Sequence, residues 1–367
     1  MRNYSIIVGS SSFFDHKIDE LDAEGEEFND VVAASDANRQ AGRKSVRVGS
    51  LIVRNNHYHG IVESAHARLG GLIEDVTTDD AVIYIHNPTA VLQRYIQREH
   101  EAGFCSLNVY REQRSALSKM TDAASKIKSI REQIVGQDRA LLEVAKTLTY
   151  LSGVKRRKPY VLMLYGKSSL GKTETAKAIA DTFFDGKMIE RHLSMFEEYS
   201  MTNSDYLFGG RPNVNSIGYE LNERESNLIF LDELDKCGRS YRSAFYSLFD
   251  SPVFIDTTYE VDIKDLLIIV TCNYLTEDEI RENLGDPIYF RIDKCIPFED
   301  FRPEDSMAIL RIEVKKQIEL AVNKVNLNYD EVLRMAADRV FIKEANGRTI
   351  QAAVRSTIED LLFARAL

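Results

Sequence analysis

The segment GKSSLGKT, from Gly166 to Thr173, constrains the fold more than any other part of the sequence. It matches the spacing G-x-x-x-x-G-K-[ST] at every fixed position, follows the apolar run VLMLY and precedes a helical pattern. Glycines let backbone N–H groups wrap around phosphates, and the start of a helix adds partial positive charge. The sequence therefore predicts a phosphate-binding loop between a buried strand and a helix.

This loop defines the first group of candidate site residues. Lys172 is expected to reach the β- and γ-phosphates of a nucleotide, and the Thr173 hydroxyl to hold Mg²⁺. ATP and Mg²⁺ are therefore the predicted cofactors. The predicted nucleotide-binding residues of the loop are Ser168, Ser169, Leu170, Gly171, Lys172 and Thr173.

Polar residues end two further apolar runs. In NLIFLDELDK, Asp232 and Glu233 follow a predicted strand, and in KDLLIIVTCNY the strand ends near Asn273. Side chains at the carboxyl ends of parallel strands lie at the ligand edge of the sheet. Asp232 suits Mg²⁺ binding, Glu233 suits polarising an attacking water, and Asn273 suits orienting that water.

Length and composition limit the class of protein. A chain of 367 residues favours two domains, and a formal net charge of −10 argues against nucleic acid as a partner. No apolar run approaches the roughly 20 residues that span a bilayer, so no membrane contact is expected. The 4 cysteines are scattered without a C-x-x-C pair, which favours reduced thiols in the cytoplasm.

The order of patterns predicts an α/β chain with four parts. Residues 1–110 hold the apolar runs YSIIVG, VRVGSLIVR, AVIYIH and FCSLNVY, and predict a smaller α/β domain for partner recognition. Residues 111–133 are polar and predict a linker helix. Residues 134–302 alternate strand and helix, as in a parallel sheet, and residues 303–367 are helical throughout.

One stretch between the predicted strands is rich in turn formers. LFGGRPNVNSIGYE, residues 207–220, holds 3 glycines and a proline, and is expected to be neither a helix interior nor a central strand.

Together these motifs resemble those of the AAA+ ATPases, and more narrowly the Clp-type branch of ring-forming unfoldases and disaggregases. The resemblance covers about residues 130–367, through IVGQDRALLEVAKTL, GKSSLGKT, LIFLDELDK, IIVTCNY, FRIDKCIPF and NGRTIQAAVRSTIEDLL. It implies a parallel-sheet P-loop fold with a C-terminal helical lid, and residues 134–302 and 303–367 as these two subdomains. It also implies a hexameric ring of identical subunits.

The resemblance assigns roles to matching residues. Ile134 and Val135 match the segment that packs on adenine, and Asn273 matches the sensor polar residue. Arg291 in FRID matches an arginine finger, which acts on the phosphate held by a neighbouring subunit. Arg348 in NGRTIQ matches a second sensor in the lid. These two arginines join Glu233 and Asn273 as the predicted catalytic residues.

The turn-rich stretch matches the loop that lines the central pore of such rings. Ser216, Ile217, Gly218 and Tyr219 are the predicted pore-loop residues, with Ser216 where relatives carry a gripping tyrosine. A shifted register would instead bring Val214 or Tyr219 to the pore. A serine offers little apolar surface to hold a polypeptide. No apolar-glycine tripeptide of the peptidase-docking kind follows Asn273, so no peptidase partner is expected.

Three functions are compatible with these features. The first is ATP-driven remodelling of a protein client by a ring. The second is an ATP-driven switch or assembly scaffold that recruits an effector through its N-terminal domain, without threading. The third, a DNA-handling motor, is disfavoured by the acidic charge.

Overall fold

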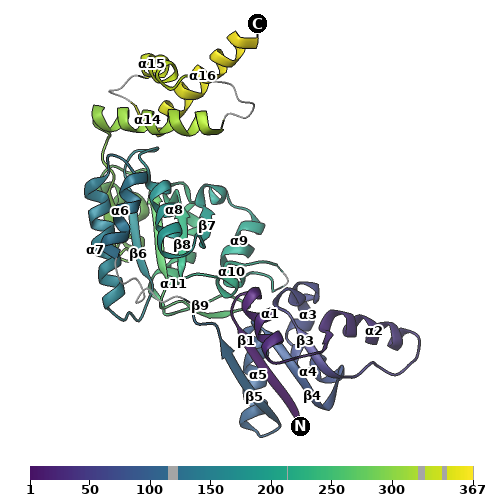
Figure 1. Ribbon diagram of the computed structural model, residues 1–367. Coiled ribbons are helices and arrows are strands. Elements are labelled where there is room, and N and C mark those ends of the chain that lie inside the picture. Colours follow the sequence, from purple (N-terminus) through teal and green to yellow (C-terminus); the bar gives the residue numbers. More distant parts are fainter. Residues whose placement is uncertain (115–122, 213, 321–326, 341–344, 367) are drawn as a thin grey trace.

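The computed structural model describes residues 1–367 except 115–122, 213, 321–326, 341–344 and 367. Three parts follow one another along the molecule: an N-terminal α/β part, a central α/β part and a C-terminal group of helices (Figure 1). No helix among the described residues has the length and apolar character needed to cross a bilayer.

The N-terminal part is built on a parallel sheet with the strand order β2-β3-β4-β1-β5. All four predicted apolar runs are strands of this sheet, which confirms an α/β N-terminal domain. Its elements are β1 (Arg2–Val8), α1 (Ser11–Glu20), β2 (Glu26–Glu27), α2 (Phe28–Gln40), β3 (Val48–Val53), η1 (Asn55–Gly60), α3 (Glu63–His66), α4 (Leu69–Asp75), β4 (Thr77–His86), α5 (Ala90–Glu101) and β5 (Cys105–Arg111).

Helix α1 covers one face of this sheet. It begins after the Ser10 cap, whose hydroxyl accepts the Phe13 N–H, and packs Phe14 against Ile7 and Ile52. A larger apolar cluster contains buried residues of α2, α4 and α5 together with strand residues such as Tyr4 and Ile83. The carboxyl ends of the parallel strands are left between these layers, pointing toward the central part (Figure 1).

The central part holds a second parallel sheet, with the order β12-β6-β11-β8-β7. Its strands are β6 (Tyr160–Tyr165), β7 (Ile189–His192), β8 (Leu228–Asp232), β11 (Leu267–Cys272) and β12 (Lys294–Pro297). Every residue of β6, β8 and β11 is buried, because helices cover both faces of a parallel sheet. The predicted α/β fold class is confirmed.

Helices α6 (Ala123–Gln133), α7 (Asp138–Gly153) and α8 (Lys172–Phe183) share one core with this sheet. Ile127 and Ile130 of α6 are buried in that core. The C-terminal half of the predicted linker helix is therefore a packed element of the central part. Residues 115–122 of the same prediction lie outside the described residues.

The turn-rich stretch is shorter than the sequence predicts. The expectation that residues 207–220 avoid helix is wrong at both ends, because α9 (Met201–Phe208) and α10 (Ile217–Glu223) enter it. Gly209 ends α9 with φ +66°, a left-handed conformation that favours glycine. Further elements here are η3 (Leu193–Phe196), η4 (Leu234–Lys236), η5 (Arg239–Tyr241), α11 (Ala244–Asp250) and the antiparallel pair β9 (Val253–Ile255) and β10 (Glu260–Asp262).

Short helices α12 (Glu277–Leu284) and α13 (Asp286–Tyr289) lead to β12. The C-terminal part then consists of α14 (Pro303–Leu320), α15 (Tyr329–Arg339) and α16 (Gly347–Ala366). Buried apolar residues of the three helices form a core of their own, including Leu310, Val332 and Val354. This small core lets the helices act as a separate layer above the central sheet.

Candidate nucleotide-binding site

The loop between β6 and α8 is held in conformations that few residues adopt. Gly166 has φ +133°, Gly171 has φ +97°, and Ser169 has φ +64° although it is not a glycine. A Cβ at Gly166 would lie 2.5 Å from the carbonyl oxygen of Phe298. Such alternating backbone conformations turn successive N–H groups toward one concave side, which suits an anion.

Lys172 opens α8 and is buried below this loop. Its Nζ donates to the carbonyl oxygens of Gly166 (2.5 Å) and Lys167 (2.7 Å), and to Oδ1 of Asn273 (3.2 Å). Burial lowers the pKa of Lys172 from its ordinary value, against the attraction of nearby carboxylates. The ammonium group therefore stands at the mouth of the loop, where phosphate oxygens could replace its carbonyl partners.

The acidic pair lies beside the same loop. Thr173 Oγ1 is 3.3 Å from Asp232 Oδ2. The Thr271 hydroxyl donates to Asp232 and in turn accepts the Glu233 N–H at 2.9 Å. Glu233 has φ +60°, so the chain turns sharply after β8 and carries its side chain out of the sheet. Thr271 was not predicted as a site residue, although it lies near the end of β11, two residues before Asn273.

Asn273 is fixed by a second acidic residue. Its side-chain amide donates to Asp235 Oδ2 (3.2 Å) and its backbone N–H to Asp235 Oδ1 (3.3 Å). The amide oxygen is left facing Lys172. Asp235 thus sets the orientation of an amide that ends β11 at the ligand edge.

A cavity of about 340 Å³ joins these groups. It brings together most of the predicted site residues: Ile134, Val135, Ser168, Ser169, Leu170, Gly171, Lys172, Thr173, Asp232, Glu233, Asn273 and Arg348. The lid closes one side, and the Gly347 N–H donates to the Ser169 carbonyl at 3.0 Å. The predicted residues of the loop, the strand ends and the lid therefore face one space.

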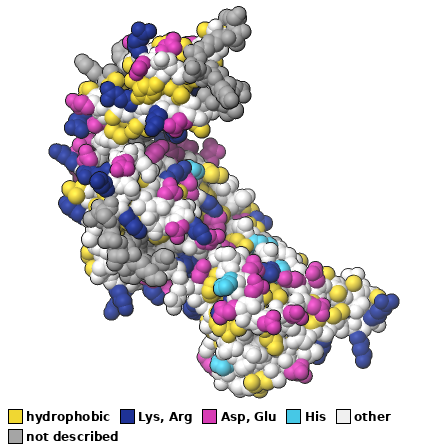
Figure 2. All heavy atoms as spheres, viewed as in Figure 1, with side chains coloured by type: hydrophobic (Ala, Val, Ile, Leu, Met, Phe, Trp, Pro, Cys, Tyr) yellow, Lys and Arg dark blue, Asp and Glu magenta, His cyan; other side chains and the backbone are white. Residues whose placement is uncertain are grey.

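The sequence did not reveal the lid residues of α14 that line the cavity. These are Ile309, Ile312, Glu313 and Lys316. They follow the helical spacing i, i+3, i+4, i+7, which could have marked them as one face. Ile312 is 46% exposed, and hydrophobic side chains gather over α14 (Figure 2). Ile309 and Ile312, together with Ile134 and Phe301, offer an apolar wall for a flat base.

Arg291 lies away from this cavity. Its Nη1 donates to the Pro287 carbonyl at 2.6 Å, and its guanidinium lies 4.9 Å from the centre of the Tyr246 ring. The structure therefore does not bring Arg291 to the nucleotide site of its own chain.

The predicted pore-loop residues lie at the start of helix α10 and not in a free loop. Ser216, Ile217 and Gly218 are buried at the start of α10, and the Ser216 hydroxyl donates to Asp256 at 2.6 Å. Tyr219 packs against His59 of the N-terminal domain, with ring centres 5.0 Å apart. In this arrangement the side chains of Ser216 and Ile217 and the backbone of Gly218 are not available to grip a polypeptide, because packing on the β9–β10 pair covers them.

Comparison with known proteins decides the family. A family model described as "AAA domain (Cdc48 subfamily)" matches residues 157–348, more than half of the chain. The AAA+ ATPase ClpV1 of Pseudomonas aeruginosa is 29% identical over 269 residues, covering 62% of this chain and 29% of the relative. The chaperone protein ClpB of Chlamydia pneumoniae is 22% identical over 347 residues, covering 83% of this chain and 39% of the relative. This chain belongs to the Clp-type AAA+ ATPases.

Solved structures agree with the fold of this AAA+ chain. A cryo-EM reconstruction of Hsp104 with ATPyS and FITC casein aligns with a TM-score of 0.58 and 13% identity, covering 99% of this chain and 88% of the other. An S. cerevisiae Hsp104:casein complex gives 0.58 and 12% identity, covering 100% and 88%. These likenesses confirm the predicted fold, and the family model with the curated relatives confirms the predicted family and ATPase class. The chain spans between a quarter and two fifths of the length of these first curated relatives.

Proposed function

We propose that this AAA+ chain hydrolyses ATP with Mg²⁺ as a subunit of a ring, most simply a hexamer, that remodels a protein client. The observation that carries the proposal is the convergence of Lys172, the Thr173–Asp232 pair and Glu233 on one cavity closed by Arg348 of the lid. Phosphate binding, a hard-cation site and a free carboxylate are the three parts that phosphoryl transfer to water requires.

Each group of residues in the cavity would have a separate role in binding or hydrolysis. Ile134 and Val135 would pack on adenine, while Lys172 and the loop N–H groups would hold the phosphates. Glu233 would take a proton from the attacking water as its oxygen bonds to the γ-phosphorus and the bond to the β–γ bridging oxygen breaks. Asn273, held by Asp235, would orient that water.

The oxygens of Thr173 and Asp232 lie 3.3 Å apart and are hard ligands of the kind that Mg²⁺ prefers. When bound, Mg²⁺ neutralises charge on the phosphates. The Thr271 hydroxyl would keep Asp232 oriented toward this position by its hydrogen bond to the carboxylate.

The proposed ring explains why Arg291 is remote from its own cavity. A guanidinium supplied by a neighbouring subunit would stabilise charge on the transferring phosphoryl group. Nη1 of Arg291 is held by the Pro287 carbonyl near the start of α13, and the guanidinium lies over the Tyr246 ring. Arg348 would complete the site from the lid of the same chain.

A second candidate function is an ATP-driven switch or scaffold that recruits an effector without threading. The burial of Ser216, Ile217 and Gly218 favours it, because a threading ring needs exposed side chains in its channel. A protein client or effector, a cytoplasmic location and the absence of a peptidase partner belong to both versions of the proposal. The 4 free cysteines agree with a reducing compartment.

The test is a pull-down with the Glu233→Gln protein in the presence of ATP and Mg²⁺. This variant should bind ATP, lose hydrolysis by roughly 10²-fold or more, and hold its client long enough for recovery. Glu197→Gln, an exposed carboxylate outside the cavity, is the matched control and should hydrolyse ATP normally.

Recovery of unfolded chains would support remodelling. Recovery of one folded protein, bound through residues 1–110, would support the switch. Normal hydrolysis by Glu233→Gln would contradict both versions.

A further inference from the structure

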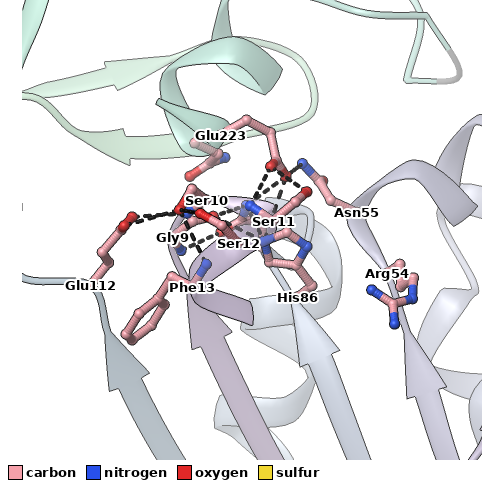
Figure 3. A network of polar contacts seen from close by, with 12 residues as sticks. Gly9, Ser10, Ser11, Ser12, Phe13, Arg54, Asn55, His86, Glu112 and Glu223 are labelled. Carbon is pink, nitrogen blue, oxygen red and sulfur yellow. Dashed lines mark hydrogen bonds and ion pairs between the residues drawn. The ribbon is translucent and has the colours of Figure 1, made fainter. Parts of the chain in front are cut away.

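The carboxyl edge of the N-terminal sheet lies directly against two elements of the ATPase domain, α10 and the β9–β10 pair (Figure 3). The Ala90 N–H at the start of α5 donates to the Thr258 carbonyl at 2.7 Å. The Tyr259 hydroxyl donates to Asn55 Oδ1 at 3.0 Å, and both side chains are buried. The two domains are therefore joined by specific polar contacts in addition to the connecting chain.

Glu223, the last residue of α10, lies at the centre of this interface (Figure 3). Its carboxylate accepts the backbone N–H of Ser11 at 2.9 Å and the Ser11 hydroxyl at 2.7 Å. It also accepts the side-chain amides of Asn55 at 2.7 Å and Asn87 at 3.1 Å. All four donors belong to the N-terminal domain, and they come from the ends of three different strands.

No lysine or arginine among the described residues lies within ion-pair distance of Glu223. Its one titratable partner at that range is His86, at 3.5 Å, and burial lowers the pKa of this imidazole, which favours the neutral ring. Neutral donors and the start of α1 therefore hold the carboxylate, whose side chain is 17% exposed. A carboxylate at this depth needs those donors, so it ties α10 to the docked N-terminal domain.

Arg114 holds the same helix from the segment after β5. Its Nε donates to the Arg224 carbonyl at 2.7 Å and its Nη2 to the Asn222 carbonyl at 2.9 Å. A cation at the carboxyl end of a helix satisfies carbonyls that have no partner within the helix. Ser216, at the other end of α10, is bonded to Asp256 in the turn between β9 and β10.

We propose that Glu223 is the latch of an interdomain clamp, in which the docked N-terminal domain fixes the positions of α10 and the β9–β10 pair. Release of Glu223 frees both elements together, because Ser216 and Asp256 connect them. The contacts named above are polar, and polar interfaces between domains separate more readily than apolar cores. The N-terminal domain thus controls the part of the ATPase domain that contains Ser216 to Tyr219.

The clamp is tested in the full chain by hydrogen exchange measured with mass spectrometry. Glu223→Gln places an amide where four donors need an acceptor. Ser11→Asp adds a carboxylate facing Glu223, at an exposed first helical position that accepts acidic residues within its own domain. Since hydrogen bonds to a charged group contribute about 1.5–3 kcal/mol, exchange in residues 217–223 and 258–262 should rise at least roughly tenfold in both variants.

The matched control is Glu225→Gln. Glu225 lies two residues further on, is exposed, and pairs with Lys187 of its own domain. Its exchange pattern should equal that of the parent protein, and strands β6, β8 and β11 should stay protected in all variants. Unchanged exchange of α10 in both Glu223→Gln and Ser11→Asp would overturn the clamp.

Turnover is a separate readout, and this part of the inference rests on the proposed function. If α10 and the β9–β10 pair move during hydrolysis, both latch variants should hydrolyse ATP severalfold faster than Glu225→Gln. Faster exchange with unchanged turnover would show that the clamp does not restrain the ATPase. Absence of hydrolysis even in the parent protein would refute the proposed function, while the exchange result would still decide the clamp.

Discussion

The two parallel sheets of this chain begin in the same way but use their carboxyl edges differently. In each, a glycine follows a buried strand and a polar turn leads into a helix: β1, Gly9 and α1 in one domain, β6, Gly166 and α8 in the other. The second edge opens on a cavity of about 340 Å³. The first is covered by the other domain.

The hydrogen-bond donors at the start of α1 show how the carboxyl edges of the two sheets differ. The Ser10 N–H and hydroxyl each donate to Glu112 at 2.9 Å, and the corresponding groups of Ser11 donate to Glu223. The chain's own carboxylates thus take the place that phosphates are proposed to take in the ATPase domain. The same strand–turn–helix geometry can serve as a ligand site or as a domain interface, depending on what faces it.

The largest expected effect comes from removing Lys172, a buried cation of the open edge. Lys172→Ala should reduce ATP binding and hydrolysis by roughly 10²-fold or more. Among the described residues that line the cavity, the other lysine is Lys316, which is exposed and belongs to the lid. Nucleotide binding is measured by calorimetry and turnover by phosphate release.

Lys167→Ala is the control for this prediction. Lys167 belongs to the same loop, but its side chain is exposed and pairs with Asp300. Its loss should change binding less than threefold, or about 0.6 kcal/mol, as expected for a surface ion pair. Equal losses in both variants would show that net charge, and not the position of Lys172, holds the phosphates.

Substituting the glycine that follows the first strand of each sheet, Gly166 or Gly9, tests the backbone at the two carboxyl edges through the free energy of unfolding. Gly166→Ala should lower the free energy of unfolding of the ATPase domain by about 2–4 kcal/mol, because the positive φ and the Phe298 carbonyl both exclude a Cβ. At Gly9 the atoms nearest to a Cβ would be side-chain atoms of Phe13 and Glu112, each at 2.7 Å. Gly9→Ala should therefore cost about 1 kcal/mol in its own domain.

Urea unfolding followed by hydrogen exchange in each sheet measures the two costs separately, because two domains need not unfold in one transition. Gly49→Ala is the control, since a Cβ there has no neighbour within 4 Å among the described atoms. A larger cost at Gly9 than at Gly166 would contradict the view that the open edge is the more constrained one.

The open edge could be predicted from sequence because its signals are local. GKSSLGKT fixes a loop through residue spacing, and Asp232 and Asn273 each end a continuous apolar run. Parallel strands place such ends together, so adjacency in space followed from the strand assignments. The sequence analysis missed Thr271 and the α14 residues because their role depends on their neighbours in the folded chain. Residue spacing alone does not identify those neighbours.

The covered edge could not be predicted in the same way. Its strands were recognised, but the contact that defines it joins Ser11 to Glu223, 212 positions apart in the chain. The burial of Ser216 likewise depends on Asp256, 40 positions further on. Turn-forming residues predicted a free loop for residues 207–220, and packing against β9 and β10 drew its last part into a helix.

The smaller of the two expected effects on ATP binding concerns the lid, which lies over the open edge as α10 lies over the covered edge. The lid approaches the loop through the Gly347–Ser169 hydrogen bond, and Arg348 lines the cavity next to it. Arg348→Ala should weaken ATP binding by roughly five- to tenfold, about 1–1.4 kcal/mol, since one partly exposed cation is lost while Lys172 remains.

The control for the lid is Arg355→Ala, an exposed arginine of the same helix outside the cavity, which should bind ATP normally. Calorimetric titration with ATP measures both variants. A loss with Arg348→Ala as large as that with Lys172→Ala would mean that the lid, and not the loop, holds the phosphates. The open edge would then resemble the covered edge. At both, binding would depend more on an element packed over the strand ends than on the loop that follows the strand.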